Sequence, residues 1–403
     1  MQSLKLSPIK EMEIRSSKLT GVVSLAQGIP NFKAPECIYR KTCEAIAEGR
    51  VDKYSLSPGM LEFRETIEMD LAERGIYYDF ESEIIVTAGA IEAITASLLA
   101  LVEPGSEVLI PDPTYTSYQE AIKNAGAAPA FFPLNEEEGW SLDVKEIEKK
   151  ITSKTRAILF CNPNNPTGTV YSRDQLLKIL ELAQRHNLYL LSDEVYRDFV
   201  YDGLDFYSLA QFSKFRNRII YIFSFSKSYA MTGWRVGFLA AERDLAKKIL
   251  AVHDVLVTCA PVVSQWGALT ALEMAGGEVE KFKSEFLERR DIVCSYLDNM
   301  TEWFEYQKPK AAYFAFPKIT KKLADQLQSS KAGNQYDMKD YQKSSLSWRF
   351  ALELLYEAKV ALVPGVAFGL KGEDHLRICF GRSNEDIEKS FARIKDYLSR
   401  KYA

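Results

Sequence analysis

Histidine and cysteine are scarce in this chain of 403 residues, which contains three histidines and six cysteines. No C-x-x-C pair occurs among the scattered cysteines, which are Cys37, Cys43, Cys161, Cys259, Cys294 and Cys379. This argues against a disulfide framework and against a zinc site. No window approaches about 18 uninterrupted apolar residues, and the amino terminus lacks an apolar segment of signal-peptide length. We therefore expect a cytoplasmic protein that does not span a membrane.

An excess of positive charge is also absent. The chain has 51 Lys and Arg against 55 Asp and Glu, a net charge of -4, and the two signs are interspersed. This balance argues against an extended polyanionic partner such as nucleic acid, so any anion site must be local. The hydrophobic share of 47% and the charged share of 26% are ordinary for a globular protein. The length suggests roughly two to three domains at about 150 residues each.

Apolar runs rich in branched residues alternate with segments of helical period through the middle of the chain. This alternation predicts an α/β fold with a mostly parallel, mixed central sheet flanked by helices. The expected strands are E-I-I-V-T-A, E-V-L-I-P-D, A-P-A-F-F-P-L, R-A-I-L-F-C-N, L-Y-L-L-S-D, R-I-I-Y-I-F-S and V-G-F-L-A-A.

Both ends of the chain have a different pattern, with amphipathic helices and shorter strands. We expect residues 47–284 to form a large domain, and residues 1–46 with 285–403 to form a smaller α+β domain built from both termini. Residues 1–15 would be an N-terminal arm. Residues 318–347 are polar and lysine-rich, which predicts a solvated insertion in the smaller domain.

The segment S-F-S-K-S-Y-A-M-T-G-W-R-V-G, residues 224–237, follows one of the apolar runs and centres on Lys227. A lysine amine forms a Schiff base with a carbonyl cofactor, and pyridoxal phosphate is the commonest such partner. The hydroxyls of Ser224 and Ser226 and the guanidinium of Arg235 are groups that bind a phosphate. A lone lysine at a strand end is more often an exposed residue, so this hypothesis depends on the rest of the chain.

Ligands of open parallel sheets gather at the carboxyl ends of strands. After E-I-I-V, the turn T-A-G opens a helix whose free amides at Ala90 and Ile91 suit a phosphate, although many βα units share this turn. After E-V-L-I, the loop P-D-P-T-Y projects Tyr115. Its ring either stacks on a heteroaromatic cofactor or belongs to the core, and the sequence favours neither.

Two further strand ends carry polar groups. The turn N-P-N-N-P-T-G, residues 162–168, is explained by turn chemistry alone, but its rigidity would also hold Asn165 in register to donate to a phenolate oxygen and a carboxylate. In D-E-V-Y, Asp193 either caps a helix or pairs with a protonated pyridine nitrogen, and Tyr196 would then approach the ring oxygen.

The combination of N-P-N-N-P-T-G, D-E-V-Y, and S-F-S-K-S with M-T-G-W-R-V-G resembles the class I/II aminotransferases of the fold-type I pyridoxal-phosphate family, the aspartate aminotransferase superfamily. The resemblance runs over nearly the full length of the chain. It implies that Lys227 holds pyridoxal 5'-phosphate as an internal aldimine and moves a proton between the substrate α-carbon and C4'. It also implies that the cofactor ring is contacted by Tyr115, Asn165, Asp193 and Tyr196. The cofactor phosphate would be bound by Ala90, Ile91, Ser224, Ser226 and Arg235.

The resemblance also supplies the substrate end of the site. Arg377, in H-L-R-I-C-F-G-R-S, matches the arginine that grips the substrate α-carboxylate, aided by Asn165 and the backbone around Gly28. The other interpretation of Arg377 is a surface charge, which suits Arg382 better. Tyr54 matches a tyrosine that relatives extend into the phosphate site of the neighbouring subunit. This implies an obligate homodimer with shared sites.

The chain departs from the aspartate-specific relatives, which read the distal carboxylate with a second cation. Ile91 stands where some of them have a lysine, and residues 249–280 contain no Lys or Arg. Burying an unpaired carboxylate is costly, so dicarboxylates are not expected to be preferred through these routes, although a cation from elsewhere would change this. Ile29, Tyr54 and Tyr115 would make an apolar pocket for neutral, aromatic or sulfur-containing amino acids. A second departure from the relatives is A-A-Y-F-A-F-P at residues 311–317. Because of it, the sequence does not predict which side chains form the floor of the pocket.

Three functions are compatible with these motifs. The first is an aminotransferase that moves an amino group from an L-amino acid to a 2-oxo acid by a ping-pong mechanism. The second is a β-lyase or synthase that uses the same cofactor for elimination. The third is a protein that binds the cofactor to sense amino acids without turnover. Such regulators usually carry a DNA-binding domain, for which the short segment before Gly28 leaves no room, so we place it last.

Overall fold

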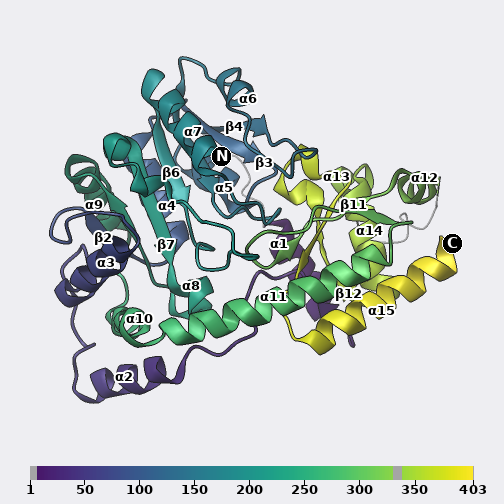
Figure 1. Ribbon diagram of the computed structural model, residues 1–403, viewed down its shortest axis with the longest axis horizontal. Coiled ribbons are helices and arrows are strands. Elements are labelled where there is room, and N and C mark those ends of the chain that lie inside the picture. Colours follow the sequence, from purple (N-terminus) through teal and green to yellow (C-terminus); the bar gives the residue numbers. More distant parts are fainter. Residues whose placement is uncertain (1–6, 330–337, 403) are drawn as a thin grey trace.

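The computed structural model describes residues 7–329 and 338–402 and is centred on a seven-stranded sheet of order β2-β8-β7-β6-β5-β3-β4 (Figure 1). The strands are β2 (Ile84–Thr87), β3 (Glu107–Asp112), β4 (Ala128–Pro133), β5 (Thr155–Cys161), β6 (Tyr189–Asp193), β7 (Ile219–Ser224) and β8 (Gly237–Ala241). Neighbours are parallel except at β8, which runs antiparallel to both β2 and β7. All seven expected strands form, and the predicted α/β class with a mixed, mostly parallel sheet is confirmed.

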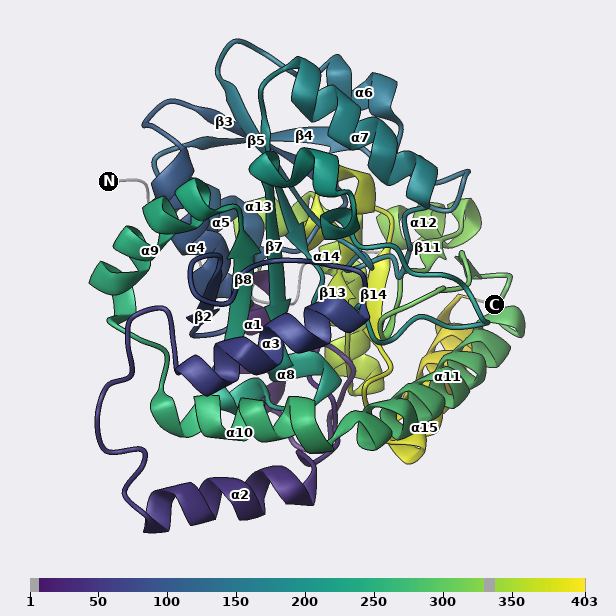
Figure 2. The ribbon, with the colours of Figure 1, turned by 60° about the vertical axis from the view of Figure 1, so that its left-hand side comes forward.

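The central strands are covered on both faces, which explains their nearly continuous apolar sequences. Every residue of β7 is buried, and in β5 only Arg156 is exposed. The helices that accompany this sheet are α3 (Leu61–Glu73), α4 (Ala90–Leu101), α5 (Ser117–Asn124), α6 (Val144–Glu148), α7 (Arg173–Arg185), α8 (Phe225–Ser228), α9 (Arg243–Val257) and α10 (Val262–Met274). Figure 2 shows α2 (Glu36–Ala47) lying along the outside of α10, against which it packs.

A second group of elements joins the two ends of the chain. Near the amino terminus, β1 (Val23–Ser24) pairs in parallel with β12 (Val360–Ala361). A small sheet has the order β10 (Phe314–Ala315), β14 (Leu376–Cys379), β13 (Val363–Pro364), and β9 (Phe304–Glu305) pairs with β11 (Lys318–Ile319). The helices of this group are α12 (Lys321–Ser329), α13 (Asp340–Lys343), α14 (Leu346–Glu353) and α15 (Asn384–Lys401). In Figure 1 the long helix α11 (Gly276–Asp298) runs from the sheet to this group and packs on α15.

The amino-terminal helix α1 (Pro8–Ser17) lies where the sheet and the second group meet (Figure 1). The side chain of Ser7 accepts a hydrogen bond from the amide of Lys10, and Pro8 follows at the first helical position. The segment expected as an N-terminal arm is therefore helical from residue 8 onward, and residues 1–6 lie outside the described residues.

The segment 318–347, which we expect to be a polar insertion, contains regular elements with some buried side chains in its described part. Lys318–Ile319 forms β11, and the amphipathic helix α12 buries Leu323 and Leu327 completely. Gln342, on α13, is buried as well. The lysine-rich composition of this segment obscured an amphipathic helix. Its two leucines are four residues apart, so they lie on one side of the helix and pack into the core. Residues 330–337 lie outside the described residues.

The direction of the strands determines where the site lies. Strands β3, β5, β6 and β7 are parallel to one another. Because β8 is antiparallel to both β7 and β2, β2 runs in the same direction as these four strands. Their carboxyl ends therefore meet at one edge of the sheet, the usual ligand edge of such folds. Among the helices of residues 7–329 and 338–402, none combines the length and the apolar character needed to cross a membrane.

Candidate active site

A cavity of about 460 Å³ opens at this edge of the sheet. Its walls come from the strand ends, from the segment around Gly28, from β14 and from α1. The predicted site residues that line it are Gly28, Ile29, Ala90, Ile91, Tyr115, Asn165, Asp193, Tyr196, Ser224, Ser226, Lys227, Arg235 and Arg377. Tyr54 does not line it: this residue is 83% exposed.

Lys227 lies on α8, a single helical turn that follows β7 directly. Ser224 caps this turn, its hydroxyl accepting a hydrogen bond of 3.3 Å from the amide of Ser226. The Lys227 Nζ donates a hydrogen bond of 2.9 Å to the carbonyl of Gly28. Burial lowers the pKa of Lys227 to about 8, and the positive charges of Arg377 and Arg235 act in the same direction. A larger fraction of this amine is therefore neutral and nucleophilic at neutral pH than in an exposed lysine.

Asp193 ends β6 and is buried at the floor of the cavity. The Tyr118 hydroxyl donates a hydrogen bond of 2.6 Å to its Oδ2, and the amide of Val195 donates one of 3.3 Å to its Oδ1. Burial raises the pKa of Asp193 to about 6, while the bond from Tyr118 and the Lys227 charge lower it. A buried carboxylate held in this way suits a cationic ring nitrogen as its partner.

An anion cradle forms between α4 and Arg235. No side chain caps α4, so the first-turn amides at Ala90 and Ile91 are available to an acceptor that enters the cavity. Arg235 has a left-handed backbone, with φ at 54°, and donates to the carbonyls of Thr232 and Ala88 at 3.1 and 3.2 Å. Gly89 has φ at 86°, and a Cβ there would lie 2.6 Å from Arg235 Nη2. Glycine is therefore required for the guanidinium to lie against the turn.

Arg377 projects from β14 and is buried between two aromatic rings. Its guanidinium carbon lies 4.6 Å from the ring centroid of Phe314 and 4.9 Å from that of Phe368. Nη1 donates to Asn165 Oδ1 at 3.2 Å, and Nη2 donates to the carbonyl of Ala26. Within the described part of the chain, its buried Nε has no hydrogen-bond partner. The fork is thus fixed in orientation and retains donor capacity for a carboxylate.

The two aromatic rings that line the cavity, those of Tyr115 and Tyr196, contact further aromatic residues. Tyr115 meets Tyr118 edge to face at 5.4 Å. Tyr196 lies edge to face with Tyr313 at 5.4 Å and with Phe314 at 5.6 Å, and the Tyr313 hydroxyl donates a hydrogen bond of 3.1 Å to the Gly28 carbonyl. The segment 311–317, which the sequence left open, therefore supports the carbonyl that also accepts from Lys227.

Comparison with known proteins decides the family. The family model described as "Aminotransferase class I and II" matches residues 20–394. The chain belongs to the class I and II aminotransferases. An aromatic-amino-acid aminotransferase of Thermococcus litoralis is 36% identical over 100% of this chain and 98% of its own. An aspartate aminotransferase of Pyrococcus abyssi is 35% identical over 98% and 96%. The crystal structure of an aromatic aminotransferase from Pyrococcus horikoshii is 34% identical, covers 96% of this chain and 99% of its own, and has a TM-score of 0.86.

Aminotransferases of this family use pyridoxal phosphate, and the residues of this chain fit that group. The cavity offers a buried amine at Lys227, a buried carboxylate at Asp193 and an anion cradle beside Arg235. These are the three kinds of partner that an aldehyde, a ring nitrogen and a phosphate require. The protein is therefore a pyridoxal-phosphate-dependent aminotransferase.

Sequence reasoning missed several residues of this aminotransferase site. Tyr118 was visible only as the last letter of P-D-P-T-Y-T-S-Y, and nothing local indicated that its hydroxyl reaches Asp193. Phe368 reaches Arg377 from η6 (Gly365–Phe368), a short 3-10 turn. The cavity is also lined by Ile9, Lys10 and Glu13 of α1 and by Gln27, Ile94, Cys161, Val195 and Thr232.

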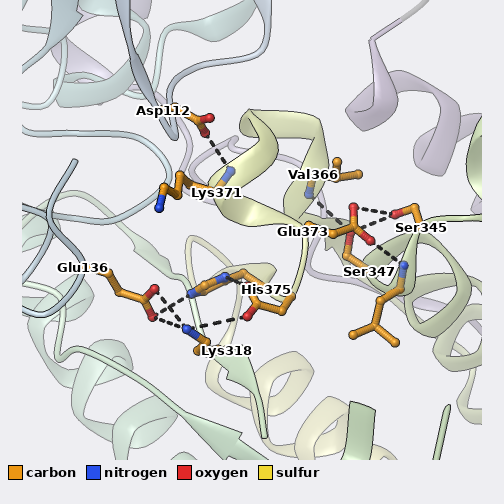
Figure 3. A network of polar contacts seen from close by, with 11 residues as sticks. Asp112, Glu136, Lys318, Ser345, Ser347, Val366, Lys371, Glu373 and His375 are labelled. Atoms are coloured by element: carbon orange, nitrogen blue, oxygen red, sulfur yellow. Dashed lines mark hydrogen bonds and ion pairs between the residues drawn. The ribbon is translucent and has the colours of Figure 1, made fainter. Parts of the chain in front are cut away.

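A polar network holds the segment that leads into Arg377 (Figure 3). Asp112, at the end of β3, accepts a hydrogen bond of 3.1 Å from the amide of Lys371. Glu373 accepts from Ser345 Oγ at 3.0 Å and from the amide of Leu346, at the start of α14. Further contacts join His375 to Glu136 at 3.2 Å and to Asp374 at 2.8 Å, and Lys318 contacts both carboxylates. Arg377 is therefore supported from the sheet and from the second group together.

Proposed function

We propose that this aminotransferase moves an amino group between a neutral, aromatic or sulfur-containing L-amino acid and a 2-oxo acid by a ping-pong mechanism. The observation that carries the proposal is the buried Arg377, whose fork is oriented by Asn165 and whose Nε has no partner among the described residues. It lines the same cavity as the Lys227 amine. A substrate gripped there by its α-carboxylate would place its α-carbon within the cavity that holds the amine.

Lys227 is proposed as the catalytic residue. When bound, pyridoxal phosphate supplies an electron-accepting ring joined to an aldehyde carbon, which allows an amino group to leave one substrate and join another. The lowered pKa of Lys227 favours the neutral amine that attaches to such a carbon. The same Nζ would act as the base that takes the proton from the substrate α-carbon, and the protonated amine would then be the acid that delivers this proton to the carbon that receives the amino group. Its hydrogen bond to the Gly28 carbonyl keeps it at the site.

The other cavity residues are proposed to hold the cofactor. Asp193 would keep its ring nitrogen protonated, Asn165 and Tyr196 would contact its phenolic oxygen, and Tyr115 would stack on its ring. The phosphate would be bound by Ala90, Ile91, Ser224, Ser226 and Arg235. The cradle between Gly89 and Arg235 supports this assignment, because a side chain at Gly89 would close it.

Substrate choice is proposed to follow from the apolar wall. Ile29, Ile91 and Ile94 line the cavity together with the ring of Tyr115. A neutral or aromatic side chain buries apolar surface against these residues without leaving a charge unpaired. The relatives include both an aromatic-amino-acid and an aspartate aminotransferase, so membership of the family leaves the substrate open, and we propose that the apolar wall of this chain selects it.

We further propose a homodimer in which Tyr54 completes the phosphate site of the neighbouring subunit. The support is its exposure of 83%, together with that of Leu56 at 69% and Val255 at 85%. The hydrogen bond from Ser57 to Asp254 joins the two segments, and large apolar residues exposed together are typical of an interface. We also keep the proposed division into residues 47–284, and 1–46 with 285–403. The pairing of β1 with β12 supports the union of the two termini, whereas α2 packs on α10, which favours counting residues 36–46 with the large domain.

The test is the visible absorption spectrum of the purified, cofactor-loaded protein as single L-amino acids are added without any oxo acid. An aminotransferase half-reaction converts the aldehyde form of the cofactor into the amine form, and phenylalanine and methionine should do this at lower concentration than glutamate or aspartate. Accumulation of an oxo acid with ammonia, while the aldehyde band persists, would replace the proposal with the β-lyase function. A protein that binds the cofactor but responds to no amino acid would contradict both.

A further inference from the structure

The wall of the cavity contributed by α1 carries an ion pair. Ile9, Lys10 and Glu13 line the cavity. Lys10 Nζ lies 2.8 Å from Glu13 Oε2, and the two side chains are 61% and 35% exposed. They therefore stand at the opening of the cavity, whereas Lys227, Asp193 and Arg377 lie deeper.

The rest of α1 is held in place from its other side. Glu11 is buried and accepts hydrogen bonds from Gln342 Nε2 at 2.9 Å and from Arg15 Nη2 at 3.0 Å. Lys339 Nζ lies 3.1 Å from the same carboxylate. These contacts tie α1 to α13 and to the residue before it, so the helix presents the Lys10 side to the cavity through a fixed attachment.

One of the cations that line the cavity has not been assigned to a group of the cofactor or of the substrate. The described lining residues include four cations, which are Lys10, Lys227, Arg235 and Arg377. Lys227 is proposed for the aldehyde, Arg235 for the phosphate and Arg377 for the α-carboxylate. Lys10 remains, engaged with Glu13 three residues along the same helix. An exposed ion pair of this kind contributes little to stability, so a ligand carboxylate can replace Glu13 as the partner of Lys10 at little cost.

We infer that Lys10 binds the distal carboxylate of a dicarboxylic substrate, the amino-acid or oxo-acid partner that alternates in this cavity with the neutral substrate. The inference rests on the proposed function, because it assumes that Arg377 holds the α-carboxylate. It supplies from α1 the second cation that the sequence lacks at Ile91 and in residues 249–280. When a neutral substrate is bound, Glu13 keeps Lys10 paired at the opening and the apolar wall contacts the side chain.

Glu13 has a defined part in this arrangement. The hydrogen bond from Lys10 lowers the pKa of Glu13, and a hydrogen bond from Gln27 acts in the same direction. Glu13 therefore stays ionised, competes with a substrate carboxylate for Lys10 and repels that carboxylate. Its removal should favour dicarboxylates, the reverse of removing Lys10.

The experiment measures two half-reactions of the cofactor-loaded protein, with glutamate and with phenylalanine as single substrates. Lys10→Gln should lower the ratio of kcat/KM for glutamate to that for phenylalanine about 10-fold or more, the size expected for a charge-assisted hydrogen bond. Glu13→Gln should raise the same ratio. Lys18→Gln is the matched control, since Lys18 follows α1 as its C-cap, lies outside the cavity lining and should leave the ratio unchanged.

A second readout does not depend on turnover. Succinate, a dicarboxylate without an amino group, should perturb the cofactor absorption of the wild-type protein and bind about 10-fold more weakly to Lys10→Gln. An unchanged glutamate-to-phenylalanine ratio in Lys10→Gln, or an equal loss for both substrates, would overturn the inference. So would a wild-type protein that reacts with phenylalanine but with neither glutamate nor aspartate. A wild-type protein that reacts with no amino acid would instead overturn the proposed function.

Discussion

The Tyr118 hydroxyl donates a hydrogen bond of 2.6 Å to Oδ2 of Asp193, and both residues are buried. Tyr118 lies on α5 and Asp193 ends β6, so the bond links a covering helix to the carboxylate proposed for the cofactor ring. The bond helps to hold the pKa of Asp193 down against the effect of burial. Tyr118 is therefore a positioning residue that acts through Asp193.

We expect Tyr118→Phe to weaken pyridoxal phosphate binding about 10-fold, because a hydrogen bond to a charged group is lost. The Asp193 pKa, about 6 in the wild type, should rise. Asp193 would then become protonated at a higher pH than in the wild type and lose the charge that pairs with a ring cation. The loss of pyridoxal phosphate affinity should therefore be larger at pH 6 than at pH 8. Titration of the cofactor-free protein with pyridoxal phosphate at both values measures this. Tyr78→Phe is the control, because the buried Tyr78 hydroxyl has no hydrogen-bond partner among the described residues and the ring under Arg216 is kept. Equal binding by both variants at pH 6 would contradict the role of Tyr118.

Lys227→Ala should abolish multiple turnover, since the only amine proposed to move the α-proton is removed. Cofactor binding should persist at reduced affinity through Asp193 and the cradle of Arg235. Steady-state rates and the visible spectrum of the reconstituted variant test both expectations. Lys178→Ala, an exposed lysine of α7, controls for the loss of a lysine and should match the wild type. Retained turnover in Lys227→Ala would refute its assignment.

Arg377→Lys should raise KM for amino acids much more than for the corresponding amines that lack the α-carboxylate. The loss for amino acids should be roughly 2 to 5 kcal/mol if the pair with the carboxylate is desolvated. The charge is kept, but the bidentate fork held between Phe314 and Phe368 is lost. Arg382→Lys is a nearby control, because Arg382 pairs with Asp386 at 3.6 Å and does not line the cavity. If Arg377→Lys leaves the discrimination between amino acid and amine intact, Arg377 does not bind the carboxylate.

The ion pairs of His375 with Glu136 and Asp374, drawn in Figure 3, predict a pH-dependent contribution to the free energy of unfolding. The carboxylates of Asp374 and Glu136 raise the pKa of His375 above its ordinary value of 6.5, although burial opposes them. The stabilisation from His375 is thus complete below pH 6.5 and is lost as pH rises through the raised pKa. The pKa values of Glu136 and Asp374 are lowered in turn, because hydrogen bonds and charge from His375 and Lys318 outweigh burial. Their contribution is lost as pH falls through those lowered values.

His375→Gln should therefore lower the thermal unfolding midpoint more at pH 5.5 than at pH 9, because the ion pairs of the protonated imidazole are lost only at the lower pH. Thermal unfolding of the wild type and the variant at the two pH values measures the difference. His186→Gln, at the end of α7, controls for the removal of a half-exposed histidine. An equal loss at both pH values would mean that His375 contributes through packing against Phe316 and Trp140 alone.

Much of the site was predictable because its residues follow strands of one sheet. Ala90, Tyr115, Asn165, Asp193 and Lys227 each come shortly after an apolar run. Parallel strands end at a common edge, so order along the chain becomes proximity in space. The family resemblance then added Arg377, which lies far away in the sequence but lines the same cavity.

Other contacts were not predictable from local pattern. Tyr118 and Phe368 look like ordinary aromatic residues in the sequence, and α12 was hidden by its lysines. Lys10 and Glu13 belong to none of the motifs of the sequence, yet α1 places them on the cavity wall. These positions depend on how distant helices pack against the sheet, which no short stretch of residues specifies.

The sequence by itself determined the fold class, the edge of the sheet that carries the site and the groups that suit pyridoxal phosphate. The physical reason is that strand periodicity, turn residues and reactive side chains are local properties of the chain. Only the tertiary structure decided which side chains support Asp193 and Arg377, and which charged residues face the opening of the cavity. Those features arise from long-range packing, where a side chain takes its role from neighbours that can be more than 100 residues away in sequence, as Arg377 and Asn165 are, 212 residues apart.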